Sequence, residues 1–218
     1  MYKNVLKIIL CTVFMFSLLI TSSFGAGSSL EKRSRIELRG GIWPHGSKTA
    51  VRVSGAETTT KTGGYMGGLA YNYWLQEDLA MTISLLGMVG DLETKTAVSE
   101  VSTHTVTIAP ILMGVRYYLP RSSFETSMRP FLAAGVGPYI GSETKSEVNL
   151  TVLVEQNTVT AFGGFLGGGM DFILSRHFTL GINTGYHFMT DFTEPLGGRD
   201  NYSGPEFSFG FGYVFGGR

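Results

Sequence analysis

The chain has 218 residues and a formal net charge of zero, so it is long enough for one domain and has no basic excess that would suggest nucleic-acid binding. Glycine contributes 30 residues, aromatic residues 12% and charged residues only 16%, where an ordinary soluble protein has about 25% charged residues. So much glycine argues against a helical protein, because each glycine weakens a helix by about 1 kcal/mol.

The N-terminal segment has the pattern of a secretory leader. Two early lysines, Lys3 and Lys7, precede an apolar run over residues 8–20 and then a stretch of mostly small residues. The apolar run is shorter than the roughly 20 residues that a membrane-spanning helix needs. We therefore predict a cleaved signal peptide over residues 1–25 and a mature domain over residues 26–218.

The rest of the chain is typical of β-strands, because its apolar residues recur with period two. Each segment has one bulky apolar row and one row of small, polar or aromatic residues, with strict alternation in most of them. This pattern predicts an all-β protein with eight strands. The segments are residues 36–43, 68–74, 79–86, 110–117, 132–140, 162–172, 178–188 and 206–215.

The row of small, polar or aromatic residues indicates which face of the strands meets water and which meets lipid. Gly163, Gly167 and Gly169 in the sixth segment would make a poor solvent face, but small residues suit the crowded lumen of a narrow barrel. Transmembrane barrels point bulky apolar residues outward and small or polar residues inward. We therefore predict an eight-stranded antiparallel up-and-down transmembrane β-barrel.

The connections fit this topology, since short and long ones alternate as they do in outer-membrane barrels. Tight turns are expected at residues 76–78 and 175–177, and a somewhat longer connection at residues 120–129. The alternation of Val148, Leu150, Val152 and Val154 predicts that the third long connection is partly a strand hairpin that extends beyond the membrane. The long polar connections are expected at residues 45–62, 91–103, 142–157 and 191–203.

Four charged residues fall on the predicted inward face, near the end with the short turns. Glu37, Arg39, Arg116 and Asp171 have formal charges that cancel, so all four can share one layer of the lumen. Buried charges persist when they are paired and hydrogen-bonded. We favour a polar plug over the alternative, a selectivity ring in a narrow pore.

Three stretches resemble the small outer-membrane β-barrel superfamily that includes the OmpX, OmpW and OmpA-transmembrane types. They are ILMGVRYY over residues 111–118, RPFLAAGVGPY over residues 129–139 and FSFGFGYVF over residues 207–215. The resemblance implies the fold more strongly than any activity, because members serve as anchors, adhesins, conduits or lipid-modifying enzymes. The last stretch looks like the aromatic C-terminal strand that the barrel-assembly machinery reads, formed here by Phe207, Phe209, Phe211, Tyr213 and Phe215.

One possible catalytic group lies on the last two segments. His187, Glu206 and Ser208 all face inward, and these residue types serve in nucleophilic catalysis. The lipid A deacylase family PagL uses such a group on an eight-stranded barrel. Its His-x-Ser pattern would place the serine at position 189, where this chain has Met189. We favour an interior histidine without catalytic function.

The sequence therefore predicts a non-enzymatic protein of the bacterial outer membrane, giving structural support or surface interaction through its loops. A narrow OmpW-like conduit for small hydrophobic molecules and a PagL-like hydrolase are the alternatives. The only cysteine, Cys11, lies in the leader, which excludes disulfides and thiolate metal sites from the mature chain. We expect no cofactor, metal or nucleic acid, and a monomer whose partners are outer-membrane lipid, lipopolysaccharide and the barrel-assembly machinery.

Overall fold

The computed structural model describes residues 30–44, 50–54, 57–62, 64–96, 101–119, 127–148 and 152–216, so the predicted signal peptide lies outside the described residues. The described part contains no helix long and apolar enough to cross a membrane. Its strands are β1 (Arg33–Ile42), β2 (Ala50–Ser54), β3 (Glu57–Thr62), β4 (Tyr65–Trp74), β5 (Leu79–Thr96), β6 (Val101–Tyr118), β7 (Met128–Val148), β8 (Val152–Ile173), β9 (Phe178–Met189) and β10 (Gly204–Gly216).

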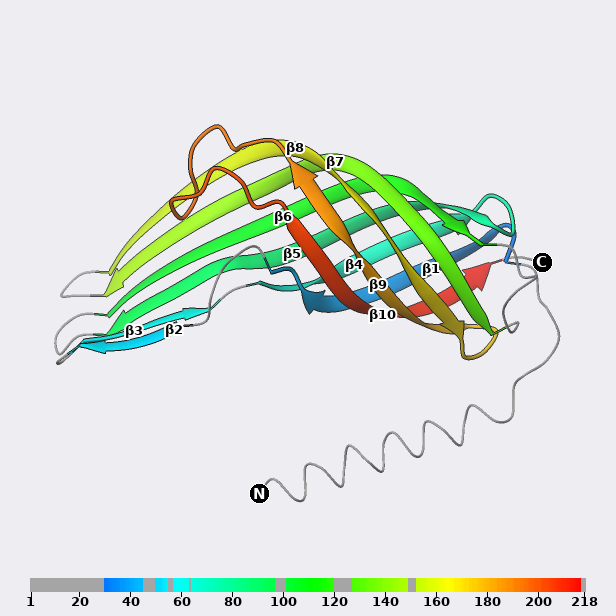
Figure 1. Cartoon of the computed structure of the whole chain (residues 1–218), viewed down its shortest axis with the longest axis horizontal. Coiled ribbons are helices and arrows are strands. Elements are labelled where there is room, and N and C mark those ends of the chain that lie inside the picture. Colours follow the sequence, from blue (N-terminus) through cyan, green and yellow to red (C-terminus); the bar gives the residue numbers. More distant parts are fainter. Residues whose placement is uncertain are drawn as a thin grey trace, which may run out of the picture.

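Eight of these strands close into an antiparallel barrel, as predicted. The hydrogen-bonded order is β5-β4-β1-β10-β9-β8-β7-β6, and pairing of β6 with β5 completes the ring. The first barrel strand, β1, pairs with the last, β10, along the whole length of β1, from Arg33 opposite Gly216 to Ile42 opposite Phe207. Figure 1 shows the strands strongly tilted around the barrel, as closure of a narrow barrel requires.

Strands β5 to β8 extend far beyond the barrel at one end, which we call the extended end. The opposite end has the short connections, and we call it the short-turn end. Strands β7 and β8 have 21 and 22 residues, against 10 in β1 and β4. Figure 1 shows β5 to β8 running past the other strands as a curved sheet, with the β2–β3 hairpin beside them. That hairpin pairs with the outer part of β5, from Thr58 opposite Thr96 to Thr62 opposite Leu92.

This extension corrects three of the four predicted long connections. Residues 91–103 were expected as a polar connection but belong largely to β5 and β6, and residues 45–62 contain the β2–β3 hairpin. Residues 142–157, predicted to be only partly a strand hairpin, belong largely to β7 and β8. The strand hairpin predicted from the valine alternation is confirmed, since β7 ends at Val148 and β8 begins at Val152. The fourth connection, residues 191–203, is a loop between β9 and β10.

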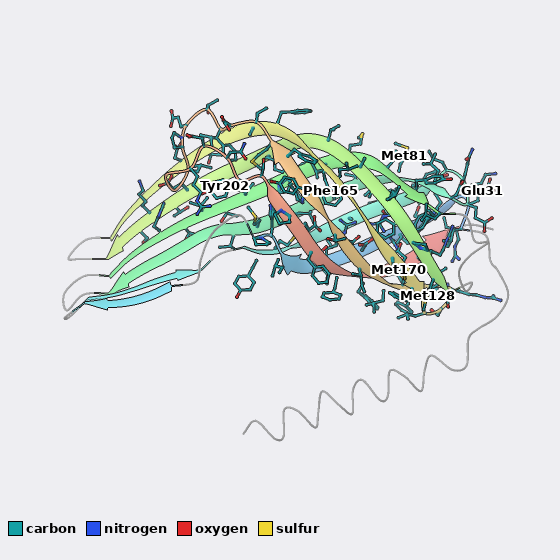
Figure 2. The ribbon with its side chains drawn as sticks, viewed as in Figure 1. Glu31, Met81, Met128, Phe165, Met170 and Tyr202 are labelled. Atoms are coloured by element: carbon teal, nitrogen blue, oxygen red, sulfur yellow. The ribbon has the colours of Figure 1, made fainter. Side chains whose placement is uncertain are left out.

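The barrel has the predicted inverted arrangement of side chains. On β10, buried and exposed residues alternate from Gly204 to Phe215. Figure 2 shows side chains such as Met81 projecting from the outer surface of the barrel. Every barrel strand contributes large exposed apolar residues to this surface, among them Leu38, Leu69, Leu85, Met113, Leu132, Phe162, Phe188 and Phe209.

The interior is filled by two apolar clusters at different levels. The cluster toward the short-turn end contains Leu30, Trp74, Ala80, Tyr118, Phe131 and Val214. The larger cluster lies toward the extended end and includes Trp43, Met88, Ile108, Tyr139 and Met189 together with three residues of the 191–203 loop, Phe192, Leu196 and Tyr202. Polar and charged side chains occupy the lumen between and beside these clusters.

Candidate functional site

Buried charged side chains form a connected cluster in the lumen, above the apolar residues of the short-turn end. Arg35 donates from Nη1 to Oδ2 of Asp171 at 2.6 Å, and its Nη2 lies 2.7 Å from Oε2 of Glu37. Arg39 donates from Nε to Oε1 of Glu37 at 2.8 Å. Arg116 lies 3.1 Å from Asp171 and 3.4 Å from Glu37. Two carboxylates are thus shared by three guanidinium groups.

The structure brings the four predicted charged residues into this cluster, but the layer is not the neutral set of four that the sequence predicted. Arg35 is a fifth member, and it makes the shortest contacts to both carboxylates. It lies on the same inward row as Glu37 and Arg39, because alternate residues of a strand share a face. Extending the alternation two residues upstream of Glu37 would have found it.

Neutral groups complete the environment of Asp171 and the arginines. Tyr118 donates its hydroxyl to Oδ2 of Asp171 at 2.7 Å, and Nη2 of Arg116 donates to Oδ1 of Asn183 at 3.4 Å. The guanidinium carbons lie over aromatic rings, with Arg116 4.1 Å from the Phe131 ring centre and Arg35 5.3 Å from that of Trp74. These contacts hold the cluster in one arrangement.

Glycines on the neighbouring strands leave the space that the cluster fills. A Cβ atom on Gly210 would meet the Glu37 carboxylate, and one on Gly212 would meet Thr179 and the Arg35 stem. The inward glycine row of β8 has the same function at other levels, since a Cβ on Gly167 would meet the Phe165 ring and one on Gly169 the Phe131 ring. The crowded lumen therefore explains the glycines at these inward-facing positions.

A second polar group lies nearer the extended end and contains the three possible catalytic residues. His187 is fully buried and stacks on Trp43, with ring centres 3.9 Å apart. Its Nε2 is 2.8 Å from Oε2 of Glu206, and its Nδ1 is 2.9 Å from the Tyr139 hydroxyl. Ser208 donates to the other carboxylate oxygen, Oε1 of Glu206, at 2.6 Å.

This geometry does not prepare Ser208 for attack on a substrate. A serine nucleophile is activated when a histidine accepts its proton, with the carboxylate behind the histidine. Here the carboxylate of Glu206 lies between the serine and the histidine, and all three side chains are buried inside the barrel. A chain of hydrogen bonds that supports packing accounts for these residues.

The 191–203 loop closes the lumen at the extended end. Leu196 and Tyr202 are buried, and the Tyr202 hydroxyl donates to the Leu196 carbonyl at 2.8 Å. Figure 2 shows Tyr202 in this loop at the outer end and Phe165 deeper in the barrel. The loop is held to β7 by the Gly197 N–H, which donates to Oε2 of Glu143 at 3.1 Å, while Oε1 of Glu143 is 2.7 Å from Nε2 of His104.

The residues of the predicted assembly signal all lie on the last strand. The aromatic row of β10 from Phe207 to Phe215 lies on the exposed outer face of the barrel. Among the residues that the structure describes, no group of three or more His, Cys, Asp or Glu side chains is arranged to hold a metal ion.

A closed eight-stranded barrel with an apolar outer surface and a charged interior is a transmembrane β-barrel. The chain belongs to the family defined by the outer membrane protein beta-barrel domain, whose model matches residues 16–215. No curated protein matches the sequence at a significant level.

Solved structures of small outer-membrane barrels are similar in fold, at low sequence identity. Ail, the attachment invasion locus protein of Yersinia pestis, in complex with the heparin analogue sucrose octasulfate, is 12% identical with a TM-score of 0.48, over 85% of this chain and 99% of that one. The N-terminal β-barrel domain of OprF from Pseudomonas aeruginosa is 12% identical with a TM-score of 0.45, over 85% and 98%. Outer membrane protein W of E. coli is 16% identical with a TM-score of 0.40, over 84% and 98%.

Proposed function

We propose that the protein is a non-enzymatic integral protein of the bacterial outer membrane, exported by its N-terminal signal peptide. In this proposal the short-turn end faces the periplasm and the extended strands stand outside the membrane. The barrel is then an anchor, and the extended sheet is the part available for interaction at the cell surface. Lipopolysaccharide surrounds the part of the barrel that lies in the outer leaflet, and the barrel-assembly machinery inserts the protein as a monomer.

The observation that carries this proposal is the obstruction of the lumen at three successive levels. The five charged residues of the cluster occupy one level, and Trp43 stacked on His187 occupies the next. The 191–203 loop packs Phe192, Leu196 and Tyr202 over the outer end. A barrel filled in this way is suited to support and display rather than to passage.

The alternatives make different demands on the same residues. A conduit for small hydrophobic molecules would use the apolar outer half of the lumen, but the 191–203 loop would first have to leave it. A lipid A hydrolase would need a serine that lipid can reach, whereas Ser208 is fully buried.

Cell fractionation together with gel electrophoresis tests the proposed location and fold. We expect the mature protein in the outer-membrane fraction, with a faster-moving folded band that shifts when the sample is boiled. An unchanged lipid A mass profile in cells that overproduce the protein would argue against the hydrolase. Recovery as a soluble periplasmic protein would overturn the proposal.

A further inference from the structure

A small cavity lies beside the charged cluster inside the lumen. It has a volume of about 30 Å³, and its polar lining comes from β1, β5, β6 and β9 through Arg39, Thr82, Ser84, Arg116 and Asn183. A single water molecule needs roughly 10–15 Å³ of such space. The cavity is therefore large enough for about two water molecules or for one small ion.

Hydrogen-bond donors without partners belong to two of the lining residues. Nε of Arg116 and Nδ2 of Asn183 are buried and have no hydrogen-bond partner. The orientation of the Asn183 amide is set by its Oδ1, which accepts from Arg116, so the amide nitrogen is the group left over. Leaving buried donors unpaired is unfavourable, which favours a ligand that accepts from both.

The charged groups that line the cavity are positive as well. Three guanidinium groups share two carboxylates, and Arg116 has the longest of these contacts, 3.1 Å and 3.4 Å. Glu206 also interacts electrostatically with Arg39, but its two oxygens are hydrogen-bonded to His187 and Ser208. The described lining residues of the cavity include two arginines and neither Asp nor Glu.

We propose that this cavity binds a small monovalent anion of the halide class, with chloride as the physiological ligand, between Arg116 and Asn183. The anion accepts from the unpaired Nε of Arg116 and Nδ2 of Asn183 and lies against the positively charged guanidinium groups that line the cavity. A cation is disfavoured by the two arginines. The anion is then a structural component of the closed barrel, and the stability of the folded protein depends on its concentration.

Thermal unfolding of the refolded protein in detergent micelles tests this site. We expect the unfolding midpoint to rise and then saturate as chloride replaces gluconate at constant ionic strength, because gluconate is too large for the cavity. In Asn183→Asp a carboxylate stands beside Arg116 in place of the anion, so the chloride dependence is lost. Gly40→Ala, a substitution away from the cavity where an added Cβ meets nothing within 4 Å, should retain it.

Anomalous diffraction from crystals soaked in sodium bromide locates the site directly, and it decides the question if Asn183→Asp does not fold. A bromide peak in the cavity beside Arg116 supports the proposal. The proposal is overturned by a midpoint that is equal in chloride and gluconate, by a chloride dependence that survives in folded Asn183→Asp, or by the absence of bromide from the cavity.

Discussion

Asp171 is the residue on which the charged cluster depends most. Its Oδ2 accepts from Arg35 at 2.6 Å, from Arg116 at 3.1 Å and from the Tyr118 hydroxyl at 2.7 Å. The side chain is fully enclosed, so these donors have no access to bulk water as a replacement. Removing this single acceptor leaves two guanidinium groups and a phenol without their shared partner.

We therefore expect Asp171→Ala to lower the free energy of unfolding by about 3–5 kcal/mol, the usual cost of breaking a buried ion pair. Urea unfolding in lipid vesicles, followed by tryptophan fluorescence, measures it. Asp78→Ala, in the short turn between β4 and β5, should stay within about 0.5 kcal/mol of the parent. A loss below 1 kcal/mol for Asp171→Ala would mean that the cluster is hydrated.

Adding Arg116→Ala to Asp171→Ala tests whether Arg35 is the stronger partner. In the parent protein Arg35 makes a shorter contact to Asp171 than Arg116 does. In the double variant Arg35 therefore still lacks its Asp171 partner. We expect little recovery of stability from the second substitution. Full recovery in the same urea experiment would identify Arg116 as the main partner of Asp171 instead.

Gly210 limits the size of the lumen at the level of Glu37. A Cβ atom at this position would meet the Glu37 carboxylate, so Gly210→Ala must displace a side chain that holds three arginines. Overpacking of this kind costs about 1–3 kcal/mol. Gly40→Ala is the matched control, because a Cβ at Gly40 has nothing within 4 Å. Equal urea midpoints for the two variants would contradict the crowded lumen.

At the scale of the element, the 191–203 loop is fixed to β7 through Glu143. Burial alone would raise the pKa of Glu143, but hydrogen bonds from the Gly197 N–H, Lys145 and His104 outweigh it, so the pKa lies below its ordinary value. A lowered pKa in the folded state means that ionised Glu143 stabilises the docked loop above the ordinary glutamate pKa of about 4.3. This contribution is lost as the pH falls through the lowered value.

Hydrogen exchange of the Gly197 amide reports on this contact. After correction for intrinsic rates, we expect protection of this amide to fall when the pH drops below the ordinary glutamate pKa, because protonated Glu143 is a weaker acceptor. Glu143→Gln should show weaker protection that no longer varies over this range. A parent protein whose protection is independent of pH would show that Glu143 does not hold the loop.

Strand β10 tests the assignment of the lipid face. Phe211 is exposed on the outer surface between the buried Gly210 and Gly212. We expect Phe211→Lys to cost about 2–4 kcal/mol if it lies near the bilayer midplane, because lysine must then leave water. Urea unfolding in vesicles measures the loss. Unchanged assembly and unchanged urea resistance would place this face away from lipid.

The barrel strands could be predicted from the sequence because their two faces differ so clearly. In residues 206–215 phenylalanines and tyrosines alternate with small or polar residues, so period and face are both evident. The outer parts of β5 to β8 have polar residues on both faces, such as the adjacent His104 and Thr105 on β6, which are both partly exposed. Without apolar alternation the outer parts of β5 and β6 could not be predicted as strands, whereas the alternation of valine and leucine predicted the β7–β8 hairpin.

The site was only partly predictable for a related reason. Face alternation identifies which residues point inward, as it did for Glu37 and Asp171. It does not determine which level of the barrel they share, since that depends on strand tilt and register. The contact of Tyr118 with Asp171, and the docking of the 191–203 loop on Glu143, join residues far apart in the sequence.

At the scale of the whole molecule, the protein combines a filled barrel with a long outer sheet. The lumen is blocked at three successive levels by the charged cluster, the Trp43–His187 stack and the 191–203 loop. Strands β5 to β8 and the β2–β3 hairpin extend beyond the exposed apolar band. The buried polar and ionic contacts are thus concentrated in the lumen, and in the proposed function the extension is the surface available to partners. The proposed role as an anchor requires a closed lumen.

Conductance of the purified protein in planar lipid bilayers tests that closure most directly. We expect no stable conductance in the parent above the background of the bilayer. Arg116→Ala should remain closed too, because Trp43, His187 and the outer loop still fill the levels above it. A stable ion conductance in the parent, with an ion selectivity that reverses when Arg116 is replaced by Glu, would contradict the closed barrel and identify the charged cluster as a selectivity ring.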